Sequence, residues 1–178
     1  MVVSEIKKRN LKGSVAELGV FRGEFAQYIH YAFSDRICYL FDTFQGFDED
    51  EAKKEIAAGN INDDFYDFYQ KTTVDVVLSK MVRSENIVIK QGLFPHSLEG
   101  LEDSFVFVSL DVDLEDSIYE GLNYFYPRLV NGGYIFVHDY NSKCLGVRTA
   151  VDKYEKINKC ILSKDPLVDV NGSLVITK

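Results

Sequence analysis

The 178-residue chain lacks several features that mark particular protein classes. It has no tryptophan, three prolines and three cysteines. Its densest apolar stretch, residues 105–110, is far shorter than the roughly 20 residues that cross a bilayer. Cys38, Cys144 and Cys160 are widely spaced and form no Cys-x-x-Cys or Cys/His zinc pattern. We therefore expect reduced thiols, and neither a membrane span, a disulfide framework nor a structural zinc site.

Basic residues are also in the minority. The sequence has 20 Lys+Arg against 28 Asp+Glu, for a formal net charge of −8. Such an acidic balance argues against binding to nucleic acid or to anionic membranes. The first ten residues contain no apolar stretch after their charges, so we expect no secretory signal and a cytoplasmic protein. With 46% hydrophobic and 27% charged residues, residues 1–178 are expected to form a single globular domain.

Apolar runs of strand length alternate with segments of helical periodicity along the chain. We expect strands at 14–18, 36–41, 87–89, 105–110, 134–137, 160–162 and 174–176, and helices at about 25–33, 48–83, 115–129 and 146–158. Strict alternation predicts parallel crossovers with helices on both sheet faces, and the short final link predicts an antiparallel edge. The expected fold class is α/β, a three-layer sandwich of Rossmann type, in which a ligand lies across the carboxyl ends of the strands.

The first expected strand ends in Glu17-Leu-Gly19-Val-Phe-Arg-Gly23. Gly19 permits a tight turn and Gly23 opens the next helix. The spacing differs from the G-x-G-x-x-G of dinucleotide binders, because Phe21 stands where a second glycine would admit a pyrophosphate. A carboxylate before this loop favours S-adenosylmethionine (SAM), which carries a sulfonium and an ammonium and no phosphate. An ordinary strand-to-helix turn is the alternative interpretation.

The next two strand ends offer contacts to a nucleoside. Asp42 follows the second strand, where a carboxylate can accept both ribose hydroxyls, and a helix N-cap is the alternative. Gly92 and Phe94 follow the third strand and would border the adenine, with a simple glycine turn as the alternative. The predicted cofactor-binding residues are therefore Glu17, Gly19, Gly23, Asp42, Gly92 and Phe94, together with Asp111.

Three carboxylates follow the fourth and fifth strands. Asp111 and Asp113 come after the fourth, and Asp139 comes after the fifth. Neighbouring parallel strands bring these ends to one rim, where like charges repel unless a cation or a proton intervenes. A hard divalent ion with oxygen ligands resolves this conflict, and solvated acids at strand ends are the alternative. An Asp-x-Asp pattern also occurs at the metal site of nucleotide-sugar glycosyltransferases.

Two histidines and one aromatic run complete the set of candidate residues. His138, beside Asp139, is predicted as a metal ligand or as a base for a substrate hydroxyl, with a hydrogen-bonded core histidine as the alternative. His96 is a second candidate base, with a plain surface histidine as the alternative. The run Phe65-Tyr-Asp-Phe-Tyr69 is interpreted as a substrate lid, an oligomer contact or a cap of the core.

Taken in order, these motifs resemble the macrocin-O-methyltransferase-like (TylF-type) family of SAM-dependent enzymes. The resemblance runs from about Val15 to Tyr154 and rests on residues 15–23, 40–47, 92–98, 109–114, 126–134 and 138–140. It implies a class I methyltransferase fold and methyl transfer from SAM to a hydroxyl of a small molecule, often a sugar of a natural product. It also implies assistance by a divalent ion, usually Mg²⁺.

The resemblance further implies roles for individual residues. Glu17, Gly19 and Gly23 would hold the methionine part of SAM and Asp42 its ribose. Asp111 and Asp139 would ligate the metal. Our own hypothesis, which the family pattern does not supply, adds His138 either as a third ligand or as the base. The metal would lower the pKa of the acceptor hydroxyl, and His138 or His96 would remove its proton before in-line attack on the methyl group.

Two departures from the family pattern bear on these expectations. The fifth strand usually ends in paired acids, whereas the first position here is His138; an imidazole weakens the case for Mg²⁺ and admits Mn²⁺, iron or no metal. The segment before the first strand is shorter than is usual in the family, so we expect a more open pocket or one completed by another subunit. The aromatic run makes a homodimer a further expectation.

Two other functions compete with the methyltransferase. A non-catalytic SAM-binding or scaffold protein would bind SAM without metal dependence or transfer. A glycosyltransferase that uses Asp111-Val-Asp113 would bind a nucleotide-diphosphate sugar, and it gives Glu17 and Gly19 no role.

Overall fold

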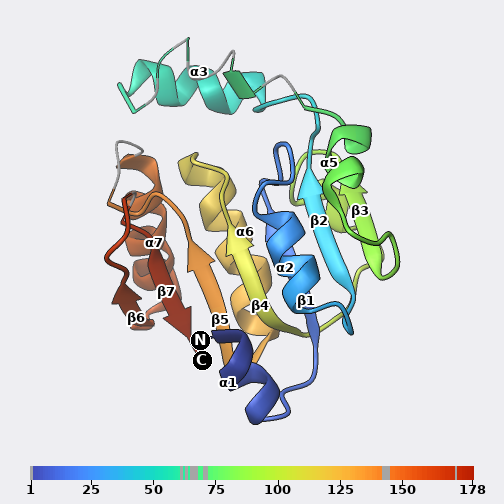
Figure 1. Cartoon of the computed structure of the whole chain (residues 1–178). Coiled ribbons are helices and arrows are strands. Elements are labelled where there is room, and N and C mark those ends of the chain that lie inside the picture. Colours follow the sequence, from blue (N-terminus) through green and yellow to red (C-terminus); the bar gives the residue numbers. More distant parts are fainter. Residues whose placement is uncertain are drawn as a thin grey trace.

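The computed structural model describes residues 2–60, 62, 64, 68–69, 72–141, 145–170 and 172–178. These residues form one seven-stranded sheet in the order β3-β2-β1-β4-β5-β7-β6, with helices on both faces (Figure 1). The strands are β1 Ser14–Leu18, β2 Cys38–Asp42, β3 Ile87–Gln91, β4 Phe105–Leu110, β5 Leu129–Val137, β6 Ser163–Pro166 and β7 Leu174–Thr177. The helices are α1 Val2–Lys8, α2 Ala26–Ala32, α3 Glu49–Ala57, α5 Val74–Lys80, α6 Glu115–Arg128 and α7 Leu145–Asn158, with a 3₁₀ turn, η1, at His96–Leu98.

The sheet is mostly parallel. Strands β1 to β5 pair in parallel, and β7 pairs antiparallel with both β5 and β6. The strand order reverses between β1 and β4, which is the place where open α/β sheets bind ligands at the carboxyl ends of their strands. The predicted Rossmann-like sandwich with an antiparallel C-terminal edge is confirmed.

Two apolar cores lie on the two sides of the sheet, because successive strand residues point to opposite faces. On one side α6 and α7 pack on the sheet, and the ring of Phe125 lies edge-on to that of Phe41 with centroids 5.7 Å apart. On the other side Ile29 of α2 and Val77 of α5 pack with Leu40 of β2. Complete burial of side chains of this size contributes about 1.5–3 kcal/mol each, and this stabilises the strand ends that carry the polar residues.

Some elements differ from the sequence-based expectation. Residues 160–162 form no strand, because Glu155 of α7 accepts the Leu162 N–H at 2.8 Å through its carboxylate and the Cys160 N–H at 3.1 Å through its carbonyl. The edge strand therefore begins at Ser163. Helix α1 was not predicted, and its single buried residue, Ile6, joins the core beside α2.

The remaining predictions about whole segments have mixed outcomes. The helical segment predicted at 48–83 contributes two described helices, α3 and α5. Cys38 is buried and Cys160 is half-buried, both as free thiols, and Cys144 lies outside the described residues. Within the described part of the chain, every helix is too short or too polar to cross a bilayer.

Helix α3 lies across the carboxyl ends of the strands, whereas both termini lie at the opposite end of the sheet (Figure 1). It is capped by Asp48, whose carboxylate accepts the N–H groups of Asp50 and Glu51. The arrangement leaves the ends of β1, β2 and β4 facing α3.

The backbones of the β1 and β4 ends approach closely at Gly19. Gly19 has φ +87°, and an added Cβ would stand 2.1 Å from the carbonyl oxygen of Asp111. Glycine is thus required here both by the backbone conformation and by the missing space.

We expect Gly19→Ala to lower the free energy of unfolding by about 3 kcal/mol, because it combines backbone strain with a backbone clash. Gly100→Ala is the matched control, since Gly100 has φ +72° and nothing within 4 Å of an added Cβ. That control should lose only about 1 kcal/mol. Urea unfolding followed by circular dichroism measures both, and equal losses would contradict the account of Gly19.

Candidate active site

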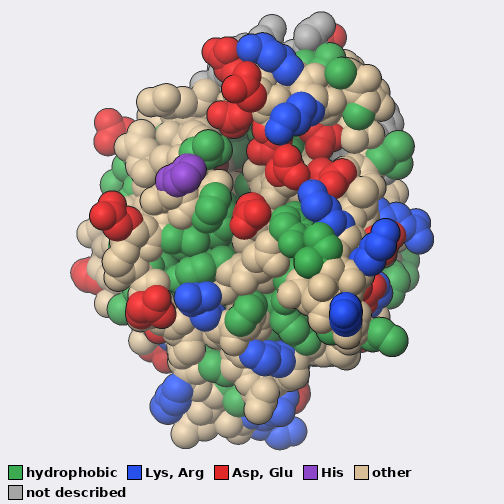
Figure 2. Space-filling view, turned by 180° about the vertical axis from the view of Figure 1, so that it is seen from behind, with side chains coloured by type: hydrophobic (Ala, Val, Ile, Leu, Met, Phe, Trp, Pro, Cys, Tyr) green, Lys and Arg blue, Asp and Glu red, His purple; other side chains and the backbone are tan. Residues whose placement is uncertain are grey.

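A cavity of about 440 Å³ lies between the carboxyl ends of β1, β2 and β4 and helix α3. Its size is that of a small-molecule site. Figure 2 shows this end of the molecule hollowed, with acidic side chains gathered at the rim. Seven described carboxylate residues line the cavity, against one arginine, Arg22. The seven are Glu17, Glu24, Asp42, Asp48, Glu51, Asp111 and Asp113.

Glu17 lines this cavity from near the end of β1. It is 1% exposed, and its Oε2 is buried without a hydrogen-bond partner. Burial, followed by the charges of Asp111, Asp42 and Glu24, raises the pKa of the Glu17 carboxyl well above its ordinary value. An ionised carboxylate in such a place is costly alone and becomes favourable when a cation binds beside it.

Asp42 ties the glycine loop to the end of β2. Its Oδ2 accepts the N–H groups of Val20 and Phe21, each at 2.8 Å, and its Oδ1 accepts the Phe44 N–H at 2.6 Å. Burial raises the pKa of Asp42, and these backbone hydrogen bonds lower it. Asp42 caps no helix, since the next described helix, α3, is capped by Asp48.

The residues predicted to contact the adenine and the methionine part of SAM differ in whether they line the cavity. Gly19, Gly92 and Phe94 line the cavity, although the Phe94 ring is only 8% exposed and stacks on Phe125 with centroids 5.8 Å apart. Gly23 does not line the cavity; an added Cβ there would stand 3.1 Å from Val77 of α5. Gly23 therefore allows α5 to pack against the loop.

Three aspartates converge at the ends of β4 and β5. Asp111, Asp113 and Asp139 each offer a carboxylate oxygen, and these atoms lie within 4.8 Å of one another. Burial and the charge of Asp139 raise the pKa of Asp111 to about 7. Asp113 and Asp139 have φ values of 61° and 56°, a left-handed backbone that costs about 1–3 kcal/mol at each residue. We call these three residues the aspartate triad.

Asp113 was predicted to converge with Asp111 and Asp139 but was not named as a metal ligand, a role given to Asp111, Asp139 and His138. Its sequence signal was the Asp-x-Asp spacing directly after an apolar strand, because the left-handed turn at residue 113 brings the second carboxylate back toward the first. Oxygen donors in such a group are the ligands that Mg²⁺ and Mn²⁺ prefer.

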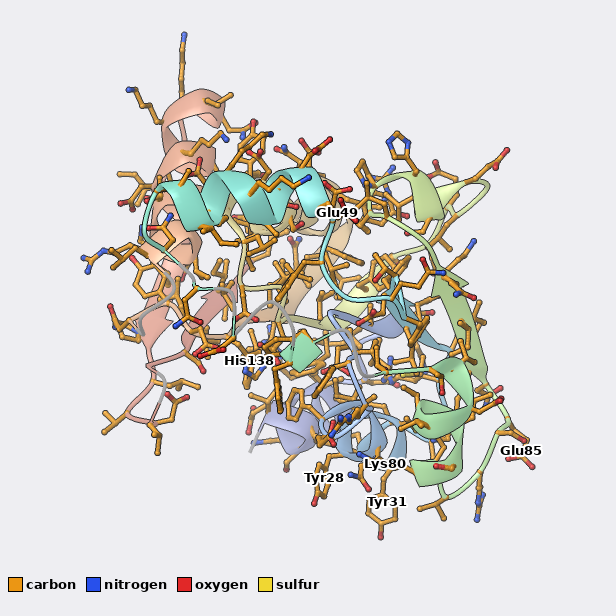
Figure 3. The ribbon with its side chains drawn as sticks, turned by 90° about the horizontal axis from the view of Figure 1, so that it is seen from above. Tyr28, Tyr31, Glu49, Lys80, Glu85 and His138 are labelled. Carbon is orange, nitrogen blue, oxygen red and sulfur yellow. The ribbon has the colours of Figure 1, made fainter. Side chains whose placement is uncertain are left out.

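The structure does not bring either candidate histidine to the aspartate triad. His138 is absent from the described group that could share an ion, and it lies beside α3 rather than beneath it (Figure 3). Its Nε2 is buried without a hydrogen-bond partner, and its ring packs edge-on to Phe25 with centroids 5.3 Å apart. Burial lowers the pKa of His138, whereas Asp139 and Asp169 raise it. His96 is exposed in η1 and does not line the cavity.

The aromatic run is described only in part. Residues 65–67 lie outside the described residues, while Phe68 and Tyr69 line the cavity. Their ring centroids lie 5.4 and 4.8 Å from that of Phe21, and the guanidinium of Arg22 lies 4.9 Å from the same ring. Phe68 and Tyr69 therefore cover the glycine loop.

Comparison with known proteins connects this geometry to a family. Demethyldecarbamoylnovobiocin O-methyltransferase of Streptomyces niveus is 26% identical over 167 residues, which are 85% of this chain and 62% of that protein. The chain thus spans less than two thirds of this relative.

Solved structures share the fold. The O-methyltransferase NovP matches with a TM-score of 0.77 at 22% identity, covering 99% of this chain and 76% of that chain. The calicheamicin methyltransferase CalS11 matches with a TM-score of 0.70 at 16% identity, covering 98% and 76%. The S-adenosylhomocysteine-bound methyltransferase PaMTH1 of Podospora anserina matches with a TM-score of 0.62 at 14% identity, covering 99% and 75%.

A family model also matches nearly the whole chain. The sequence model of macrocin-O-methyltransferase (TylF) matches residues 1–176, which is nearly the whole chain. Four of the motif segments that suggested this family, residues 15–23, 40–47, 92–98 and 109–114, contribute residues to the cavity lining. The chain belongs to the macrocin-O-methyltransferase (TylF) family.

Proposed function

We propose that this protein is a SAM-dependent O-methyltransferase that acts on the hydroxyl of a small molecule. The observation that carries the proposal is the acidic cavity, lined by a buried Glu17 whose Oε2 has no hydrogen-bond partner. Such a cavity attracts a cation and repels a diphosphate. Membership of the family supports the transfer of a methyl group to oxygen.

Different lining residues would bind different parts of SAM. Glu17 would bind the ammonium of the methionine part. Asp42 would bind the ribose, because its Oδ1 accepts one N–H and a carboxylate oxygen can accept a second hydrogen bond. Gly92 and Phe94 would border the adenine. Gly23 would act indirectly, by holding the loop against α5.

We propose Mg²⁺ or Mn²⁺ as a second cofactor, held by Asp111, Asp113 and Asp139. The oxygen atoms of these residues fit a hard divalent ion in both chemistry and spacing. A bound ion of this kind supplies a Lewis acid that lowers the pKa of the acceptor hydroxyl. In this proposal Asp113 takes the ligand position that the sequence had given to His138.

The reaction also requires that the acceptor hydroxyl lose its proton. Asp111 lines the cavity, but as a ligand of the ion it would be held ionised and would not serve as this base. The Nε2 atom of His138 is shielded and His96 lies outside the cavity lining, so we propose that the proton would pass to water from a hydroxyl whose pKa the ion lowers. The acceptor oxygen then forms a bond to the methyl carbon as the carbon–sulfur bond breaks, leaving neutral S-adenosylhomocysteine.

The two competing functions remain distinguishable. A nucleotide-sugar glycosyltransferase is disfavoured by seven described lining carboxylates and one arginine, because diphosphate binding needs cations or bare backbone N–H groups. A non-catalytic SAM-binding protein would differ from the proposed enzyme only in that it transfers no methyl group. Calorimetry with SAM and with UDP-sugars, each with and without Mn²⁺, distinguishes a methyltransferase from a glycosyltransferase, which would bind the UDP-sugar. Release of S-adenosylhomocysteine in the presence of hydroxyl acceptors distinguishes a methyltransferase from a protein that only binds SAM.

Glu17→Gln tests the cation site directly. We expect SAM affinity to fall at least about tenfold, because a charge-assisted hydrogen bond is lost. The ligand-free variant should nevertheless be more stable than the parent protein at pH 8. A carboxyl whose pKa is raised by folding stabilises the folded state only while it is protonated. This stabilisation is lost as the pH rises from 4.5, the ordinary pKa of a glutamate, through the pKa of Glu17 in the folded protein. At pH 4 the two proteins should be equally stable.

Calorimetry and urea unfolding at the two pH values measure these effects. Glu49→Gln is the control, since Glu49 is an exposed glutamate of α3 that does not line the cavity (Figure 3). Unchanged SAM affinity in Glu17→Gln, or a loss of stability at pH 8, would contradict the role of Glu17.

Removal of a triad carboxylate tests the metal proposal. We expect Asp113→Asn and Asp139→Asn each to weaken Mn²⁺ binding at least about tenfold, because the site loses a charged ligand. Asp116→Asn is the control, since Asp116 is an exposed residue of α6 paired with Lys153. Titration followed by the electron paramagnetic resonance of free Mn²⁺ gives the affinities. Equal affinities in all four proteins would remove the triad from the metal site.

A further inference from the structure

The first turn of α6 is capped by residues of another helix. Leu114 occupies the N-cap position and provides no side-chain hydrogen bond. The N–H groups of a first helical turn still need acceptors. Two glutamates of α3 supply them: Glu55 Oε1 accepts the Glu115 N–H at 3.0 Å, and Glu51 Oε1 accepts the Ser117 N–H at 2.8 Å.

Both carboxylates use their second oxygen as well. Glu51 Oε2 accepts the Ser117 hydroxyl at 2.7 Å, so this residue is bound through backbone and side chain. Glu55 Oε2 accepts the Asn60 amide at 2.6 Å, and Glu55 is only 6% exposed. An added Cβ at Gly146 would stand 3.1 Å from both Glu55 oxygens, so the start of α7 leaves room for this carboxylate.

An ion pair described between α3 and α6 is weak by comparison with these hydrogen bonds. Lys54 and Asp116 lie 3.7 Å apart, but their side chains are 72% and 52% exposed. Exposed pairs of this kind contribute little, whereas buried carboxylates at a helix N-terminus are favoured by both hydrogen bonds and the helix dipole. Glu51 and Glu55 therefore dominate the polar contacts described between the two helices.

This contact joins two parts of the site. On one side, α3 crosses the carboxyl ends of the strands (Figure 1), and Asp48 and Glu51 line the cavity. On the other side, α6 begins two residues after Asp113, which is buried and has a left-handed backbone. A first turn without acceptors would loosen the segment that carries this aspartate.

We propose that Glu51 and Glu55 are positioning residues that hold α3 over the cavity and fix the turn after Asp113. The proposal rests on the proposed function, since it takes the cavity to be the cofactor site. Glu55 does not line the cavity, and Glu51 lines it with both carboxylate oxygens bound to Ser117. They act through the placement of α3 and of the aspartate triad.

The test compares hydrogen exchange and cofactor release in Glu51→Ala and Glu55→Ala. Mass spectrometry should show amide exchange at least about tenfold faster both in α3 and in residues 113–118, with β4 unchanged. Stopped-flow measurement should show S-adenosylhomocysteine dissociating at least about fivefold faster. Glu51→Gln should restore most of both properties, because an amide oxygen can still accept the Ser117 N–H.

A matched control separates this effect from a general loss of stability. Glu155→Ala removes a carboxylate that accepts the Leu162 N–H at 2.8 Å and pairs with Lys164, away from the cavity. It should leave exchange in residues 113–118 and cofactor release unchanged. If the alanine variants of α3 do not fold, Ser117→Ala is a milder variant that removes the hydroxyl donated to Glu51 Oε2. Because Ser117 also lines the cavity, its readout is amide exchange alone, which should rise about twofold in α3 and in residues 113–118.

Faster exchange confined to α3, or unchanged cofactor release, would overturn the proposal. Equal effects in Glu155→Ala would also overturn it. If the parent protein binds no S-adenosylhomocysteine, the proposed function fails, while the exchange measurement, which needs no ligand, still decides whether the two glutamates couple α3 to α6.

Discussion

Buried negative charge at the carboxyl ends of the sheet is the constraint on which the rest of the structure depends. Glu17, Asp42 and Asp111 end three adjacent strands, and burial raises the pKa of each carboxyl. Carboxylates held so close together destabilise a fold unless cations or N–H groups compensate them. Asp42 is compensated within the chain by three backbone N–H groups, whereas Glu17 Oε2 has no such partner. In the proposed function, a bound cation would supply the partner that Glu17 Oε2 lacks within the described chain.

The surrounding fold offsets what these residues cost. Phe21, Asp113 and Asp139 have left-handed backbones, so part of the backbone strain described in the chain lies at this end of the sheet. Beneath it, Phe41, Phe94 and Phe125 pack their rings with centroids 5.7–5.8 Å apart, and β4 is buried along its whole length. The apolar layers thus fix the strand ends, which in turn fix the carboxylates. Stability and site geometry are supplied by different parts of the same strands.

The sequence predicted those features that arise from local patterns. The bounds of β1 and β4 coincide with the predicted runs, because a continuous apolar stretch ended by a polar residue has few other solutions. The contacts of Glu55 with Glu115 and of Glu51 with Ser117 join residues 60 and 66 positions apart and leave no local signal. His138 is adjacent to Asp139 in sequence, yet the left-handed turn at Asp139 sends the two side chains to different surroundings.

Proton release on SAM binding tests the central claim most directly. A cation that binds beside a carboxyl with a raised pKa lowers that pKa, so a proton must leave. Calorimetry of SAM binding near pH 7, repeated in buffers of different ionisation enthalpy, gives the number of protons exchanged. The account predicts a net release of protons, reduced in Glu17→Gln. Binding without proton release, or proton uptake on binding, would contradict it.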